Sequence, residues 1–195
     1  RFAPAGVLAP KSKADLAFTM HILSWLAVDG TAAIVEFPGV MYRGGAEQKI
    51  RKYLVDNNFV DAIIQLPSDL FFGTGIATCI LVLKKSKKDN SVLFIDASAE
   101  FIRENTKNKL ATENRATILE GFKKREDKDY FSKLVPNEDL AKNDYNLSVS
   151  YYVAKEDTRE VVDIVELNKE IERIVSKQSE LRTQIDAIVK DLQGN

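Results

Sequence analysis

The chain has 195 residues, 45% of them hydrophobic, and a formal net charge of −1. This composition supports a packed core and excludes a globally disordered chain, while the balanced charge neither favours nor excludes a nucleic-acid partner. Cys79 is the only cysteine, which excludes an internal disulfide framework and favours a buried thiol in a reducing, cytoplasmic setting. No apolar run reaches the length of a membrane span, and no signal peptide is evident, so we expect no membrane partner.

A helix is predicted near the start of the chain. Ser12 fits its N-cap, and Asp15 three residues later makes a weak capping box. Side chains at helical spacing mark one face of this helix: Ala14, Ala17, Phe18, His21, Trp25 and Val28. His21 is the only histidine. Without a second histidine or a further cysteine, the sequence predicts no metal site of the zinc type.

The next elements alternate between strand and helix. Residues 31–37 are predicted as a strand, 46–57 as a helix and 59–66 as a second strand, an order that implies a βαβ crossover and a parallel pair. In this helix, the side chains expected to face inward are Ile50, Tyr53 and Leu54, and those expected to face outward are Glu47, Lys49, Arg51 and Lys52. Residues 78–83 return after a connection without helical pattern, so we expect an antiparallel strand.

The sequence becomes more polar after this point. Residues 91–96 are predicted as a strand at a sheet edge, and a short helix is expected from Ser98 or Ala99 towards Asn105. Residues 112–125 form an amphipathic helical pattern, with Ile118, Leu119 and Phe122 expected to face inward. Residues 134–140 are predicted as a turn into a short helix, and residues 143–152 as an extended segment.

The connection between the strands at 59–66 and 78–83 contains the sequence Phe71-Phe72-Gly73-Thr74-Gly75. Glycines allow sharp turns and close approach to a ligand. Aromatic rings in a loop are costly to leave in water unless they stack on something. Two interpretations follow: either both rings fold back to cap the core, or at least one ring faces a flat partner such as a nucleobase. The residues alone favour the first.

The last segment has the clearest periodicity in the chain. Apolar residues and one glutamine alternate at spacings of three and four: Ile164, Leu167, Ile171, Ile174, Gln178, Leu181, Ile185, Ile188 and Leu192. This pattern of a and d positions predicts a coiled-coil helix, with Gln178 at an a position serving register and partner choice. The partner must be another chain, another domain or a second copy. Ten acidic against six basic residues in 156–195 disfavour a DNA-binding arm.

No complete catalytic constellation is present in the sequence. It contains no G-x-G-x-x-G, no P-loop and no G-x-S-x-G. The glycine pairs Gly44-Gly45 and Gly73-Thr74-Gly75 are isolated, and no two carboxylates have a spacing that demands joint action. From the residues alone we therefore predict part of an α/β sheet domain with a C-terminal interaction helix.

Seven stretches together resemble a known family. They are Arg1-Phe2, KADLAF (13–18), AIVEFPGVMYRGGAE (33–47), Ile50-Arg51, LPSDLFFGTGI (66–76), IDAS (95–98) and NDYNLS (143–148). In order and spacing, these stretches resemble the DNA-methyltransferase (modification) subunit of type I restriction–modification systems, with the type IC branch the most similar. The resemblance extends over nearly the whole chain, and the heptad helix agrees with it.

The resemblance implies a fold, a reaction and a cofactor. The family transfers a methyl group from S-adenosylmethionine to N6 of adenine in DNA, on a Rossmann-like mixed sheet with an antiparallel hairpin and flanking helices. Its glycine-containing cofactor loop and its Asn-Pro-Pro-Phe motif are absent here. We therefore expect a C-terminal portion of the subunit with no catalytic residue, no cofactor bound to the fragment alone and no independent activity.

The resemblance also implies a division of the chain. Residues 1–105 correspond to the C-terminal part of the Rossmann-like catalytic domain, 106–155 to a helical and irregular connecting region, and 156–195 to a coiled-coil-like helix for subunit assembly. The alternative, outside the family, is a nucleotide-binding Rossmann domain with a coiled-coil dimerisation tail.

Site residues and partners follow from the same resemblance. Phe71, with Phe72 as the alternative, is expected to stack on the flipped target adenine. Arg43, Lys49 and Arg51 are candidates for DNA phosphate contacts, against the alternative of a solvated helix face. The expected partners are double-stranded DNA, the restriction subunit and a specificity subunit embraced by two modification subunits. The heptad residues are expected to contact that specificity subunit.

Overall fold

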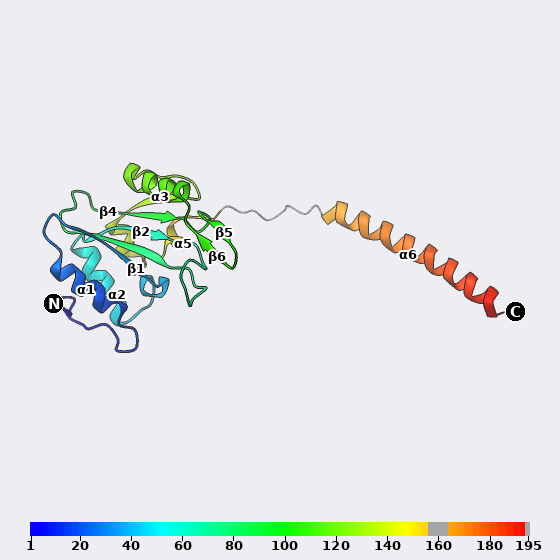
Figure 1. Cartoon of the computed structure of the whole chain (residues 1–195), viewed down its shortest axis with the longest axis horizontal. Coiled ribbons are helices and arrows are strands. Elements are labelled where there is room, and N and C mark those ends of the chain that lie inside the picture. The colour runs from blue at the N-terminus through cyan, green and yellow to red at the C-terminus, as the bar shows by residue number, and fades with distance from the viewer. Residues whose placement is uncertain (156–163, 194–195) are drawn as a thin grey trace. The chain divides into compact units, whose positions relative to one another are not determined.

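A computed structural model describes residues 1–155 and 164–193. The chain divides into two compact units, Arg1–Glu156 and Asp157–Asn195. Figure 1 shows a sheet between helices in the first unit and one long helix in the second. None of the helices in the described ranges is both long and apolar enough to cross a membrane.

The first unit is built on a five-stranded mixed sheet with the order β1-β3-β2-β4-β7. Its strands are β1 (Thr31–Glu36), β2 (Val60–Gln65), β3 (Cys79–Lys84), β4 (Ser91–Asp96) and β7 (Ser132–Pro136). β3 is antiparallel to both β1 and β2, β2 is parallel to β4, and β4 is antiparallel to β7. The predicted antiparallel return of β3 is thus confirmed.

Two expectations about strand neighbours were wrong. β1 and β2 run in the same direction but are not a hydrogen-bonded pair, because β3 lies between them. β4 is not an edge strand, because β7 pairs with its other side. Both errors have one cause: the sequence indicates where strands are, but only long-range packing decides which strands become neighbours.

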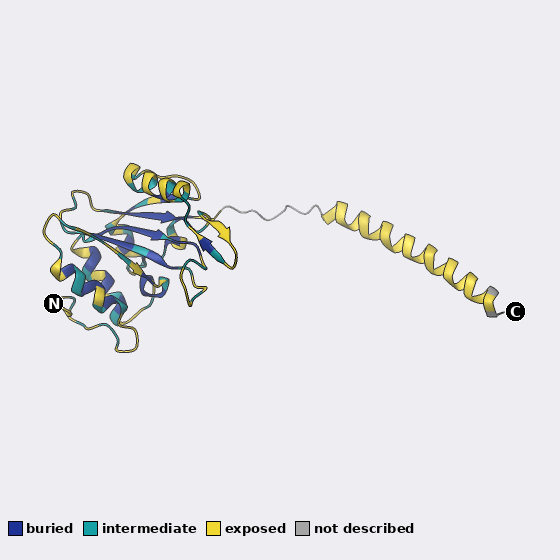
Figure 2. Ribbon diagram, in the orientation of Figure 1, coloured by how far each residue is buried: buried dark blue, intermediate teal, exposed yellow. Residues whose placement is uncertain are grey.

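Each face of the sheet carries its own core. On one face, Leu81 and Leu83 of β3 pack with buried side chains of α1 (Asp15–Trp25), α2 (Ala46–Asp56), α4 (Asn137–Lys142) and α5 (Val149–Tyr152). On the other face, Val82 packs in a cluster that includes Ile118 of α3 (Thr112–Lys124). Alternating strand side chains point to opposite faces, so one strand contributes to both cores. Figure 2 shows the strands buried beneath helices with exposed outer faces.

Helix α1 buries a different face from the one marked in the sequence. Its buried residues are Leu16, Thr19, Met20 and Leu23, whereas Phe18, Trp25 and Val28 are exposed. The N-cap is Ala14, without a side-chain hydrogen bond, so Ser12 does not cap the helix. Apolar residues lie on both sides of this helix, and periodicity alone therefore did not select the side that packs on the sheet.

The segment after β4 also differs from expectation. Instead of a helix from Ser98 towards Asn105, the chain forms a hairpin of β5 (Ile102–Glu104) and β6 (Lys107–Lys109), with Asn105 in the left-handed region at φ 55°. Helix α3 forms as predicted and buries Ile118, but Leu119 is exposed. The expected extended segment at 143–152 ends in the helical turn α5.

The expected connecting region at 106–155 is not separate from the sheet. It supplies β7 as an edge strand, and α3, α4 and α5 as covering helices, so it belongs to the same compact unit as residues 1–105. A 3-10 turn, η1 (Pro38–Met41), completes this unit. In the second unit, α6 spans Ile164–Gln193, and the predicted helical residues 156–163 lie outside the described ranges.

Candidate nucleic-acid interface

The candidate site lies where β1, β2 and β4 end. These strands run in the same direction, so the connections that follow them leave from one edge of the sheet. They are residues 37–45, 66–78 and 97–101. In open α/β sheets, ligands bind outside the carboxyl ends of the parallel strands. Phe71, Phe72 and Arg43 lie in these connections, whereas Lys49 and Arg51 lie in helix α2, which begins directly after the first of them.

The 66–78 loop begins and ends in the sheet. Its base is closed by the Leu66 N–H, which donates to the Thr78 carbonyl oxygen at 2.8 Å. Farther out, the Asp69 N–H lies 3.4 Å from the Gly75 carbonyl oxygen, and Leu70 packs against the core under α3. Gly73 has φ +77°, a conformation that favours glycine. The outer part of the loop therefore projects beyond a fixed base.

Neither loop phenylalanine is buried in the core. Phe71 is 40% exposed and Phe72 is 99% exposed. The core-capping interpretation is therefore wrong for Phe72, whose ring contributes nothing to the packing of this unit. A fully exposed ring at the edge where α/β sheets bind ligands is suited to stack on a flat partner.

The β5–β6 hairpin lies against this loop. The Asn108 N–H donates to the Asp69 carbonyl oxygen at 3.0 Å, and Lys107 Nζ donates to the Phe71 carbonyl oxygen at 3.0 Å. Sequence reasoning missed both residues, because it placed a helix just before them. The one available signal was Asn105, a residue type that tolerates the left-handed conformation of a tight turn.

The three candidate phosphate contacts occupy different environments. Lys49 is exposed. The Arg43 side chain is 34% exposed and forms an ion pair with Glu47 at 3.3 Å. Arg51 is only 2% exposed, and its guanidinium donates to the carbonyl oxygens of Tyr145, Val40 and Arg43 at 2.8, 2.9 and 2.7 Å. Glu47 and Arg51 therefore do not face outward, and Arg51 is a structural cation.

A polar cavity of about 480 Å³ lies beside Arg51. It is lined by Tyr42, Gly44, Gln48, Arg51, Lys142, Asn143, Asp144, Asn146 and Tyr151. Residues from the NDYNLS stretch thus meet the loop that follows β1. Helix α2 contacts the same stretch, because Gln48 Nε2 donates to the Asp144 carbonyl oxygen at 3.3 Å.

A buried carboxyl group marks the end of β1. Glu36 is 5% exposed, and its Oε1 accepts a hydrogen bond from Thr19 Oγ1 at 2.5 Å. Burial raises the pKa of Glu36, the Thr19 hydrogen bond opposes this shift, and Asp15 adds to it. Burial likewise raises the pKa of Cys79 to about 12, so this thiol is a small core residue rather than a nucleophile. Within 1–155 and 164–193, no group of three or more His, Cys, Asp or Glu residues is placed to hold a metal ion.

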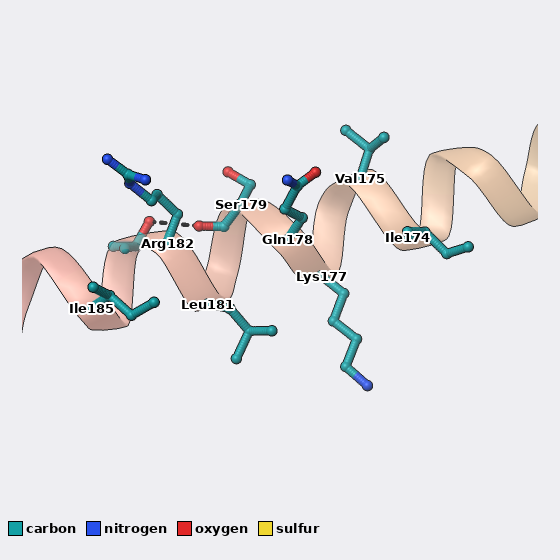
Figure 3. A pocket seen from close by; sticks show the side chains of 9 residues that line it. Ile174, Val175, Lys177, Gln178, Ser179, Leu181, Arg182 and Ile185 are labelled. Atoms are coloured by element: carbon teal, nitrogen blue, oxygen red, sulfur yellow. Dashed lines mark hydrogen bonds between the residues drawn. The ribbon is translucent and has the colours of Figure 1, made fainter.

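Helix α6 carries the heptad residues on an exposed surface. The eight apolar members are between 47% and 76% exposed. A hollow of about 850 Å³ lies along this helix, and its lining, from Ile174 to Ile185, belongs to α6 alone. Figure 3 shows Ile174, Leu181 and Ile185 projecting from the helix with no other element beside them. Because one helix lines the hollow, it is an open surface rather than an enclosed site.

Comparisons with known proteins cover most of the chain. A family model described as N-6 DNA Methylase matches residues 1–161. The MpnII methylase subunit of a type I restriction enzyme from Mycoplasma pneumoniae is 51% identical over 193 residues, which cover 98% of this chain and 36% of that protein. The MjaVIII methylase subunit from Methanocaldococcus jannaschii is 34% identical over 190 residues, covering 94% and 32%.

Solved structures of methyltransferase subunits are also similar to this chain. The type I restriction-modification system methyltransferase subunit from Streptococcus thermophilus is similar with a TM-score of 0.76 and 44% identity, covering 78% of this chain and 33% of that one. The type I restriction enzyme EcoKI M protein has a TM-score of 0.61 at 18% identity, which is a likeness of fold. The chain spans about a third of the length of the relatives that it matches.

Proposed function

Because this chain belongs to the N-6 DNA methylase family, we propose that it is the C-terminal portion of a type I modification subunit. In the full-length protein, the proposed reaction is transfer of a methyl group from S-adenosylmethionine to N6 of adenine in DNA. In this proposal, the five-stranded sheet of this chain is the C-terminal part of a Rossmann-like catalytic domain, and β3 is its reversed strand. No observation favours the alternative of a nucleotide-binding domain outside the methyltransferases.

The sequence lacks the family's glycine-containing cofactor loop and its Asn-Pro-Pro-Phe motif. The polar cavity beside α2 is lined by charges of both signs, Arg51, Lys142 and Asp144, so it is not selective for a sulfonium cation. We propose that the chain alone neither binds the cofactor productively nor methylates DNA. A methyl-transfer assay on the isolated chain tests this, and turnover above background would contradict it.

The proposed role of the 66–78 loop is to hold the target base. An adenine amino group inside a duplex is out of reach of a methyltransferase, so the base must leave the stack and be held in a pocket. Stacking of a base on an aromatic side chain contributes about 1–3 kcal/mol. The observation that carries this proposal is the 99% exposure of Phe72 beside a 40% exposed Phe71.

The two phenylalanines support this role on different grounds. The family resemblance assigns the stacking position to Phe71, whereas exposure leaves more free ring on Phe72. The test replaces each by alanine in the full-length subunit, assembled with its partners, and measures kcat/KM for methylation. A loss of about 1–3 kcal/mol of stacking corresponds to a fall of roughly fivefold to 150-fold.

A third variant of the same loop serves as the control. Ile76 is 60% exposed and lacks an aromatic face, so Ile76→Ala should leave kcat/KM within about twofold of the unaltered enzyme. Unchanged turnover in both phenylalanine variants would rule out base holding by this loop. The variant with the larger loss identifies the stacking ring.

Arg43 and Lys49 are proposed as phosphate contacts, and Arg51 is left out because it is buried. A cation that contacts a phosphate contributes about 0.9 to the steepness of the plot of log K for DNA binding against log salt. Removing that cation should therefore make the slope shallower by about 0.9. Titrations of full-length Arg43→Met and Lys49→Met with duplex DNA measure this slope. An unchanged slope would assign these residues to a solvated helix face.

Helix α6 is proposed to bind the specificity subunit of a type I complex. All eight of its apolar heptad side chains are exposed in this unit, and burying one Leu or Ile fully stabilises an assembly by about 1.5–3 kcal/mol. The proposed complex contains two modification subunits per specificity subunit, a restriction subunit and double-stranded DNA.

A further inference from the structure

We propose that Lys107 and Asn108 of the β5–β6 hairpin are positioning residues that hold the Phe71–Phe72 loop in its base-receiving conformation. This inference rests on the proposed function of that loop. It adds two residues to the site that lie more than thirty positions after the loop residues that they contact.

The described contacts within the loop do not fix its outer part. Beyond the base at Leu66 and Thr78, they are the 3.4 Å approach of the Asp69 N–H to the Gly75 carbonyl oxygen and the 3.1 Å contact between the Ile76 N–H and Thr74 Oγ1. Neither contact involves Phe71 or Phe72. A loop held only in this way would sample many conformations, and ordering it on base binding would cost entropy.

Asn108 fixes the first half of the loop. Its side chain is buried, its Nδ2 donates to the Ser68 carbonyl oxygen at 2.9 Å, and its backbone N–H donates to the Asp69 carbonyl oxygen at 3.0 Å. Its Oδ1 accepts from Arg103 Nη1 at 3.0 Å. Because both ends of the amide are engaged, the side chain has one orientation, and it holds Asp69 in the left-handed conformation at φ 54°.

Lys107 fixes the tip of the loop. Its ammonium group donates to the carbonyl oxygens of Phe71 and Thr74 at 3.0 and 3.1 Å, and lies 3.9 Å from an Asp69 carboxylate oxygen. The two carbonyl groups flank Phe72 and Gly73 in sequence, so one cation closes the turn that carries the most exposed ring. A charged donor makes stronger hydrogen bonds than a neutral one.

The consequence is a preorganised stacking surface. A ring that already stands in its binding position needs no ordering when the base arrives, and misplacement of a binding group by about 1 Å can cost on the order of a hundredfold in rate. Removing the side chain of Lys107 or Asn108 should therefore weaken capture of the base without removing any aromatic ring. A residue that only stabilised the fold would not act on this loop selectively.

The test uses the full-length subunit assembled with its partners. Lys107→Met and Asn108→Ala, called the clamp variants below, are compared with Lys109→Met, a matched control on the same hairpin. Lys109 is exposed, pairs with Glu104 at 3.0 Å and has no described contact with the loop. Hydrogen exchange of residues 69–76 is measured, together with the fluorescence of a duplex carrying 2-aminopurine at the methylated adenine.

In both clamp variants, exchange in residues 69–76 should rise while exchange in β2 and β3 stays unchanged. The fluorescence of 2-aminopurine should fall, because a base that is captured less often returns to the duplex, where stacking quenches it, and kcat/KM should fall on the order of tenfold. Lys109→Met should match the unaltered enzyme, and Lys107→Arg should recover part of the loss. Unchanged exchange in both clamp variants, or an equal rise in Lys109→Met, would overturn the proposal.

These measurements separate this inference from the proposed function. If exchange rises in the clamp variants while Phe71→Ala and Phe72→Ala methylate normally, the hairpin positions the loop but the loop does not hold the base. The base-holding proposal then fails, and Lys107 and Asn108 then have no role in methylation through this loop. If the phenylalanine variants lose activity while exchange in the clamp variants is unchanged, only the positioning role is contradicted.

Discussion

Nε of Arg51 donates to the carbonyl oxygen of Tyr145 at 2.8 Å, joining helix α2 to a segment 94 positions later in the chain. Nη1 of the same guanidinium donates to Val40 and Arg43 carbonyl oxygens. Burial lowers the pKa of Arg51 to about 10, which still leaves it charged at neutral pH. One cation therefore links the loop after β1, helix α2 and the NDYNLS stretch.

Replacing Arg51 should destabilise the protein strongly. Arg51→Met leaves one buried and two part-buried carbonyl oxygens without their donor, and we expect a loss of about 2–4 kcal/mol in the free energy of unfolding. Thermal unfolding of the full-length subunit measures the change. Lys49→Met on the exposed face of the same helix is the control and should change stability by less than about 0.5 kcal/mol. Equal melting temperatures for the two variants would contradict the structural role.

Glu36 should make stability depend on pH. Its folded pKa is raised above the ordinary value of 4.5, so the folded state favours the protonated carboxyl. The stabilising contribution of that proton is complete below the ordinary pKa and is lost as the pH rises through the folded pKa. At neutral pH the buried charge remains as a cost. Glu36→Gln should therefore raise the melting temperature more at pH 8 than at pH 5.

The control for this comparison is the exposed Glu138. Glu138→Gln should shift the melting temperature little at either pH, because this side chain is solvated. A Glu36→Gln effect that is the same at pH 5 and pH 8 would show that ionisation of Glu36 is not linked to folding.

Gly121 offers a prediction whose sign depends on tertiary packing. In an exposed helix, replacing glycine by alanine stabilises by about 1 kcal/mol. In α3, however, a Cβ at Gly121 would lie 2.6 Å from Phe131 Cε1. We expect Gly121→Ala to destabilise by about 1–3 kcal/mol through overpacking. Thermal unfolding should show recovery in the double variant with Phe131→Leu, and a stabilising Gly121→Ala would contradict the packing seen here.

The heptad face of α6 should govern assembly. Leu181 occupies a d position and is 51% exposed, whereas Ser176 lies on the opposite side of the heptad. Leu181→Asp places a charge in the proposed interface and should reduce copurification with the specificity subunit at least tenfold. Ser176→Asp adds the same charge elsewhere and should copurify normally. Full retention of the specificity subunit by Leu181→Asp would contradict the proposed contact.

Local patterns in the sequence determined most elements. The β-branched run of β3, the amphipathic spacing of α2 and α3 and the heptads of α6 each encode their own conformation, because periodicity and turn residues act over a few positions. The aromatic loop was also identifiable, because Phe71 and Phe72 stand beside glycines between two strands. The family resemblance was carried by such local stretches as well.

Only the tertiary structure decided which elements meet. It placed β3 between β1 and β2, turned Arg51 inward and brought Lys107 and Asn108 onto the aromatic loop. None of these contacts has a local signature, because partners that lie 11 or more positions apart in the chain leave no periodic trace. The sequence thus determined the parts of this protein, and long-range packing and hydrogen bonding decided which side chains are structural and which remain free to act.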